Sequence, residues 1–191
     1  MNSNKYYNFA KNELFPICRS ITGKGTEQTL KKIQRFFPKL KIYKIKSGTK
    51  IFDWKIPEEW NIKNAYVIDK YQNKIIDFKK NNLHIVGYSK PIKKKLTKKE
   101  LLNKIYSLPA QSDAIPYVTS YYKKDWGFCT TDIVRKLIVK NYSKNDKFDV
   151  LIDTSFKKNG YLQYGEYFIK GKTSKEIIIS TYICHPSMAN N

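Results

Sequence analysis

The chain has 191 residues, which accommodates one full domain or one domain with part of a second. Its apolar fraction of 41%, with 15 Tyr, 10 Phe and 3 Trp, excludes an intrinsically disordered chain. No apolar run approaches the ~20 residues that span a bilayer, so a membrane protein is not expected. The net charge of +21 suggests nucleic acid as a partner, but the basic residues are almost all Lys and are spread along the chain, which disfavours that function.

The N-terminal residues and the cysteines indicate a cytoplasmic protein. The first fifteen residues contain no apolar signal core and no cleavage site of small residues. Cys18, Cys129 and Cys184 are far apart and form no CxxC pair, which is typical of reduced thiols that pack as small apolar side chains.

Residues 1–51 read in the order helix, helix, strand. A short helix is predicted from Lys5 to Phe15, where Pro16 ends it. After a glycine-containing turn, Leu30, Ile33 and Phe37 recur at helical spacing from Thr26 up to Pro38. Residues 40–46 (LKIYKIK) then predict a strand.

Residues 52–122 read as a small β-rich domain inserted into the first one. The segments AYVID and KIIDF flank a short polar loop, as in a hairpin, and LHIVGY is a further strand candidate that would make His84 a structural residue. Phe52, Trp54 and Trp60 are expected to form the aromatic core of this region.

A capping box is predicted at Thr97–Glu100, where each side chain can bond to the backbone amide of the other residue. A helix over 98–106 should follow, with Leu101, Leu102 and Ile105 facing inward. The lysine run KKKLTKK is then interpreted as the solvated approach to a helix.

Residues 123–191 return to an α/β pattern. A helix is predicted over 131–139, followed by the strand candidates KFDVLID, YLQYGEYFI and EIIISTYIC. The last is apolar over most of its length, as expected for a strand covered on both faces. His185 follows it, at the kind of strand end where α/β folds gather catalytic groups.

Five segments carry a resemblance to a known family, and they span nearly the whole chain: LFPICRSITGKGTEQTL, SGTKIFDWKIPEEWNI, NLHIVGYSKP, LPAQSDAIPYVTSYYKKDWGFC and ISTYICHPSMANN. Together they resemble the N-terminal part of a bacterial family of aminopeptidase-like proteins, some of which lie among polysaccharide-biosynthesis genes. The resemblance implies an α/β fold: a zinc-aminopeptidase-like domain, incomplete here, with an inserted β-rich, jelly-roll-like domain, and a winged helix beyond this chain.

The resemblance also implies metal ligands. His185 matches the first zinc ligand, and Asn191 stands where related peptidases place a bridging Asp. A neutral amide bridges two cations much less well than a carboxylate does, so the two-metal assignment is open. The general-base Glu and the remaining ligands belong to later segments, so the chain is expected to be an N-terminal fragment that is inactive alone.

Three functions remain as alternatives. The leading one is a fragment of a zinc-dependent hydrolase whose complete form acts on a peptide or an amine-bearing small substrate, with a homo-oligomer left open. The second is a non-catalytic glycan- or protein-binding module in which His185 is vestigial. Nucleic acid binding through the lysine excess ranks last and predicts a strong dependence on salt.

Overall fold

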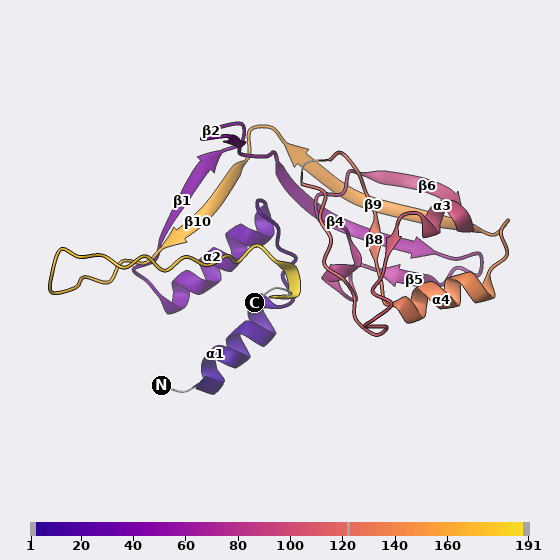
Figure 1. Ribbon diagram of the computed structural model, residues 1–191, viewed down its shortest axis with the longest axis horizontal. Helices are drawn as coiled ribbons and strands as arrows, with labels where there is room; N and C mark the ends of the chain where they lie inside the picture. Colours follow the sequence, from indigo (N-terminus) through magenta and orange to yellow (C-terminus); the bar gives the residue numbers. More distant parts are fainter. Residues whose placement is uncertain (1–2, 122, 189–191) are drawn as a thin grey trace. The chain divides into compact units, whose positions relative to one another are not determined.

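A computed structural model describes residues 3–121 and 123–188 (Figure 1). Contacts divide the chain into two compact units, residues 1–59 with 157–191, and residues 60–156. The boundaries predicted at 52 and 122 do not coincide with this division. Residues 123–156 belong with the second unit because they supply one helix and a central strand of its sheet.

The first unit begins with helices, as the sequence predicts. The helix predicted over 5–15 is present as an α-helical turn followed by a π-helical turn, and both the second helix and the strand after it are confirmed. Its elements are α1 (Ser3–Phe9), η1 (Ala10–Leu14), α2 (Lys24–Phe36), β1 (Lys41–Lys46), β2 (Lys50–Ile51), β3 (Trp54–Lys55), β10 (Tyr161–Glu166) and η3 (Pro186–Met188).

A two-stranded antiparallel sheet, β1 with β10, joins the two ends of the first unit. Tyr43 pairs with Tyr164 in its register. Helix α2 covers one face of this sheet. A Cβ at Gly165 of β10 would lie only 3.0 Å from the Leu30 side chain of α2, which shows how closely the helix packs there. On that face Glu27 of α2 also accepts a 4.0 Å ion pair from Lys44 of β1.

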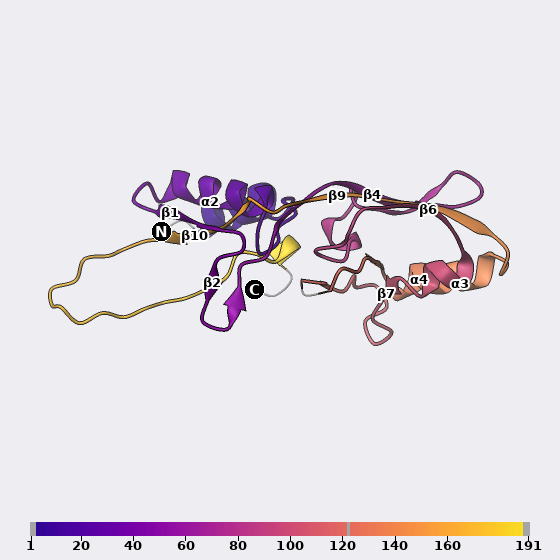
Figure 2. The same ribbon diagram turned by 90° about the horizontal axis from the view of Figure 1, so that it is seen from above.

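The second unit is built on a four-stranded sheet of order β5-β4-β9-β6. The predicted hairpin is confirmed as β4 paired antiparallel with β5, and the predicted strand KFDVLID is confirmed within β9. Figure 2 shows α3 and α4 on one side of this sheet. The elements are β4 (Glu59–Ile68), β5 (Lys74–Asp77), η2 (Asn82–His84), β6 (Ile92–Thr97), α3 (Lys98–Leu102), β7 (Ile105–Tyr106), β8 (Phe128–Cys129), α4 (Asp132–Asn141) and β9 (Lys147–Lys157).

Alternation along β9 defines the core side of that sheet. Phe148, Val150 and Ile152 are buried, whereas the residues between them are more exposed, as expected for a sheet with one face on the core. Leu101 of α3 and Ile138 of α4 are also fully buried. The second unit therefore has a hydrophobic core of its own.

The predicted aromatic core is only partly correct. Trp60 is buried, stacks on Tyr88, and donates its indole N–H to the Ser89 carbonyl over 3.0 Å. Phe52, by contrast, is 92% exposed, and Trp54 is half-buried. Phe52 lies in the tight turn between β2 and β3, with φ at +53°, and this turn leaves its side chain in solvent instead of in the core.

The capping box is confirmed, but the helix that follows it is shorter than predicted. Thr97 accepts from the Glu100 amide, and Glu100 accepts from the Thr97 amide. The helix ends at Leu102 because Ile105 and Tyr106 form β7, which pairs with Phe128 and Cys129 of β8. Leu101 and Ile105 are buried as predicted.

Two predicted strands are wrong in this structure. LHIVGY begins as the 3-10 turn η2, because the Asn81 side chain caps it by accepting from the Leu83 amide, and afterwards only isolated bridges form. Residues 176–184 form no strand, and Ile177, Ile178 and Ile179 are exposed. A strand needs a neighbour for its backbone groups, and no described strand pairs with this segment.

Candidate functional site

The turn after residues 176–184 holds His185, the predicted first metal ligand. The ring of His185 lies against that of Tyr182, with centroids 4.8 Å apart. The Cys184 thiol lies 4.0 Å from the imidazole Nδ1. Asn191, the other predicted ligand, lies outside the described residues.

Arg19, near the N-terminus, forms a hydrogen bond with this turn. Its guanidinium Nε donates to the His185 carbonyl over 3.0 Å, across a sequence separation of 166 residues. Only 4% of the Arg19 surface is exposed. Among the described Asp and Glu residues, none forms an ion pair with Arg19. A buried charge is costly when unpaired, so the bond to His185 contributes to holding Arg19 in place.

The segment carrying Arg19 is fixed by local chemistry at the start of α2. Thr26 donates its hydroxyl to the Ser20 carbonyl, and Thr29 donates to the Gly25 carbonyl over 2.9 Å. A side chain at Gly25 would place its Cβ 1.9 Å from the Cys18 carbonyl oxygen, so only glycine permits this approach. The turn before α2 is therefore packed tightly against the helix.

Burial controls the protonation of His185 and of the thiols near Arg19. Burial raises the pKa of Cys18 to about 12 and also raises the pKa of Cys184, so both thiols stay protonated at neutral pH. Burial, followed by the nearby charge of Arg19, lowers the pKa of His185. His185 is therefore a neutral imidazole at neutral pH, which is the form that binds metal ions.

The described residues do not by themselves form a zinc site. Zinc in proteins takes three or four Cys, His or carboxylate ligands. In residues 3–121 and 123–188, no group of three or more His, Cys, Asp or Glu side chains is placed to hold a metal ion. The turn at His185 supplies one imidazole, beside which lie the protonated Cys184 thiol and the cationic Arg19 guanidinium.

His84 is a structural residue, as predicted, although it lies in η2 rather than in a strand. Its Nδ1 lies 2.7 Å from the Cys129 carbonyl oxygen, and burial lowers its pKa. That carbonyl belongs to β8, so His84 connects η2 to β8 within the second unit.

A groove in the second unit was not predicted. It has a volume of about 330 Å³ and is lined by Tyr66, Lys93–Lys95 and Asp149–Leu151. The three lysines are exposed on β6, which leads directly into α3, so this run is the solvated approach to a helix as predicted, although it forms a strand itself. Lys95 pairs with Asp149 over 3.5 Å, and Lys74 lies over the Tyr66 ring at 5.1 Å. The register of β6 with β9 brings these groups together, and the lysine run alone does not predict that register.

No helix in the part of the chain that is described combines the length and apolarity needed to cross a membrane. The three cysteines are free thiols.

Comparison with known proteins identifies two relatives from Clostridium acetobutylicum. One is named "Putative polysaccharide biosynthesis protein with aminopeptidase-like domain", and it is 49% identical over 179 residues, which are 94% of this chain and 40% of that protein. The other is the crystal structure of a "putative peptidase", with 47% identity and a TM-score of 0.88 over 98% of this chain and 43% of that one. The chain thus spans less than half the length of both relatives.

The two relatives that match this chain thus carry the words "aminopeptidase-like" and "peptidase" in their names. Residues 7–191 match a family described as "Domain of unknown function (DUF4910)". Because the match covers nearly the whole chain, this protein belongs to that family.

Proposed function

We propose that this chain is the N-terminal part of a zinc-dependent, aminopeptidase-like hydrolase that serves polysaccharide biosynthesis in the cytoplasm. The observation that carries the proposal is the bond from buried Arg19 to the His185 carbonyl, in a chain 49% identical to a protein named for an aminopeptidase-like domain. A turn anchored in this way presents its imidazole in a defined place, which a metal ligand requires.

In this proposal His185 and Asn191 supply two of the zinc ligands, and residues outside this chain supply the others. Zinc bound there would activate water and polarise the carbonyl of a peptide or an amine-bearing small substrate. No catalytic step follows from the described residues alone, since His185 is the one proposed zinc ligand among them. The 191-residue chain by itself is accordingly expected to have no hydrolase activity.

A chimera tests this function. The 191 residues of this chain take the place of the segment that they match in the Clostridium acetobutylicum relative. The resulting chimera is assayed for zinc content and for hydrolysis of aminoacyl p-nitroanilides. We expect bound zinc and hydrolysis in the chimera, and neither activity nor zinc in the 191-residue chain alone. Replacing His185 with Ala should lower kcat/KM at least about 100-fold. Losing a residue that only hydrogen-bonds to a metal ligand already costs up to about 100-fold, and losing the ligand itself should cost no less.

The matched control for His185→Ala is His84→Gln, which changes the other histidine and retains a hydrogen-bonding group at η2. Its kcat/KM should stay within about threefold of the unsubstituted chimera, because a residue with a structural role and no part in the chemistry alters mainly stability. A folded chimera that holds no zinc, or that keeps its activity after His185→Ala, would contradict the proposed function.

The groove beside Tyr66 favours a second candidate, a non-catalytic module that binds an acidic glycan. Its volume suits one or two sugar rings, its lysines suit carboxylates, and Tyr66 offers a ring face. Lys93→Gln with Lys95→Gln should weaken binding of oligogalacturonate at least about tenfold in calorimetry, since two charged contacts are lost. Lys170→Gln with Lys172→Gln, in the first unit, is the control with the same change in charge. Equal weakening by both pairs would indicate unspecific attraction and remove this candidate.

A further inference from the structure

The guanidinium of Arg19 is enclosed by protein but only partly bonded. Its Nε donates to the His185 carbonyl over 3.0 Å, and 4% of the residue's surface is exposed. Within residues 3–121 and 123–188, the Arg19 side chain forms no other hydrogen bond and no ion pair. A guanidinium carries N–H donors on all three of its nitrogens, so those on Nη1 and Nη2 have no partner in this part of the chain.

The positive charge of Arg19 is not balanced by the groups around it. Burial lowers the pKa of the Arg19 guanidinium, and the nearby thiols of Cys184 and Cys18 oppose this shift. Burial keeps both thiols protonated at neutral pH, so they supply no negative charge. A buried charge without a counter-charge is costly, and the surroundings of Arg19 therefore favour a bound anion.

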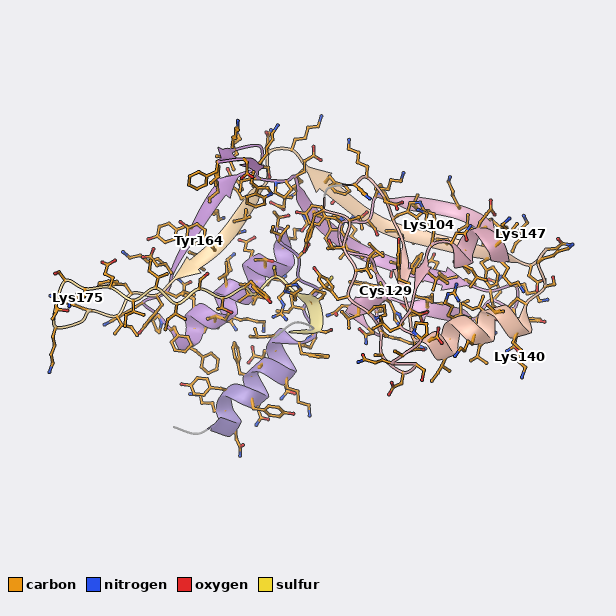
Figure 3. The ribbon with its side chains drawn as sticks, in the orientation of Figure 1. Lys104, Cys129, Lys140, Lys147, Tyr164 and Lys175 are labelled. Atoms are coloured by element: carbon orange, nitrogen blue, oxygen red, sulfur yellow. The ribbon has the colours of Figure 1, made fainter. Side chains whose placement is uncertain are left out.

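A carboxylate suits this guanidinium better than a phosphate does. Nη1 and Nη2 form the end of a planar fork, whose parallel N–H groups match the two oxygens of a carboxylate. A phosphate monoester carries a charge of about −1.5 to −2 and calls for a second cation. The groups whose charge acts on Arg19 include no lysine, and Figure 3 shows Lys175 at the outer end of the segment between β10 and η3, away from η3.

An anion on Arg19 lies beside the proposed zinc ligand, because Arg19 bonds to the backbone of His185 itself. An extended peptide advances about 3.3–3.6 Å per residue, so only a group a few atoms away along a substrate can reach Arg19 while an amide lies at His185. A short peptide or an N-acylated amino acid places its carboxylate at that separation. A long polypeptide places its terminal carboxylate many residues away.

We propose that Arg19 is a specificity-determining residue, which binds the free carboxylate of a short peptide or an N-acylated amino acid whose scissile amide lies at His185. Hydrolysis of such a substrate rests on the function proposed above. Binding of the carboxylate by Arg19 requires neither zinc nor hydrolysis, so the two ideas can be tested separately.

An NMR titration of the isolated chain tests carboxylate binding without zinc. The arginines of the chain are Arg19, Arg35 and Arg135, each with one Nε–H signal, and Arg19→Gln identifies the signal of Arg19. N-acetylglycine should shift this signal saturably, with an affinity at least about tenfold higher than that of N-acetylglycinamide, which lacks the charge. The signal of Arg35, which is exposed on α2, is the internal control and should respond equally to both compounds.

Hydrolysis by the zinc-loaded chimera gives a second readout. Leu-Gly and Leu-glycinamide differ only in the C-terminal carboxylate, and kcat/KM should be at least about tenfold higher for Leu-Gly. Arg19→Gln keeps a group that can donate to the His185 carbonyl but removes the charge, so the ratio of the two kcat/KM values should fall to about 1. A purely structural role of Arg19 would lower both values and leave their ratio unchanged.

Arg35→Gln is the matched control, because it makes the same chemical change at an exposed position of α2. It should leave the ratio of the two kcat/KM values as it is in the unsubstituted chimera. The chimera is also titrated by NMR, since a carboxylate from outside this chain would already occupy Arg19 there and abolish its response to N-acetylglycine.

Two outcomes would overturn the proposal. One is an Arg19 signal that does not distinguish N-acetylglycine from N-acetylglycinamide, in the isolated chain or in the folded chimera. The other is a preference for Leu-Gly that persists in Arg19→Gln. A chimera that holds no zinc contradicts the proposed function instead, and the NMR titration then decides for or against Arg19 by itself.

Discussion

Replacing Phe148 with Ala is expected to lower the free energy of unfolding of the second unit by about 3–5 kcal/mol, the largest effect of any single substitution considered. Phe148 lies on β9, a central strand of the four-stranded sheet, and its side chain is fully buried. Its ring packs against that of Tyr142 with centroids 5.0 Å apart. Removing the ring forfeits its transfer energy and leaves a cavity that the rigid sheet cannot close.

Urea unfolding followed by tryptophan fluorescence measures this loss, because Trp60 is buried in the same unit and reports on it. Phe156→Ala is the matched control on the same strand. Phe156 is 38% exposed, so its replacement should cost less than about 1.5 kcal/mol. Equal costs for the two substitutions would show that the sheet does not bury Phe148 as described.

Replacing Asp69 with Ala is expected to cost about 2–4 kcal/mol, because it removes the acceptor of several hydrogen bonds at once. Asp69 sits in the turn between β4 and β5 and is buried. Its carboxylate accepts from the Tyr71 amide over 2.9 Å, from the Asn73 amide over 2.8 Å, and from the Tyr142 hydroxyl over 2.7 Å. Without it, the turn amides and the Tyr142 hydroxyl lose their partner.

The same residue predicts how stability varies with pH. Burial opposes ionisation of the Asp69 carboxyl, but its hydrogen bonds from Tyr142, Asn73 and Tyr71 outweigh burial and hold its pKa below the usual value. A carboxyl with a depressed pKa in the folded state stabilises the fold above its unfolded pKa, near 3.9, and this stability is lost as pH falls through the lower folded pKa. Stability should therefore decrease below about pH 4.

Asp69→Asn should flatten that decrease, because an amide does not titrate in this range. Asp153→Asn, on the exposed side of β9, removes one carboxylate with the same chemistry and should leave the decrease in place. Unfolding in urea between pH 3 and pH 7 measures all three proteins. Should Asp69→Asn and Asp153→Asn alter the pH dependence equally, the decrease would come from net charge rather than from the Asp69 hydrogen bonds.

Tyr142 is the donor in one of the hydrogen bonds to Asp69, and this bond also affects the pKa of the Tyr142 hydroxyl. Burial, and then the hydrogen bond to Asp69, raise the pKa of Tyr142 to about 12. The hydroxyl therefore stays protonated and donating throughout the range from pH 3 to pH 7. Through this bond the hairpin turn of β4 and β5 is linked to the segment between α4 and β9.

Features that depend on neighbouring residues could be predicted from the sequence. The capping box at Thr97 and Glu100, the β4–β5 hairpin and helix α2 each rest on residues three to ten positions apart. Their hydrogen bonds and periodicity are local, so the sequence alone specifies them. The resemblance of five short segments likewise indicates the family, which the match over residues 7–191 shows, and it singles out His185 as a candidate ligand.

Features that depend on distant residues were decided by the tertiary structure. The bond from Arg19 to His185 joins positions 166 residues apart, and nothing near Arg19 in the sequence indicates it. The groove beside Tyr66 exists because strand register places three strands' side chains together, and Phe52 is exposed because it sits in a turn. The run at Ile177–Ile179 has the composition of a buried strand, yet a strand also requires a partner, and composition cannot supply one. Local propensity selects an element, whereas pairing and burial depend on which distant segments are present to meet it.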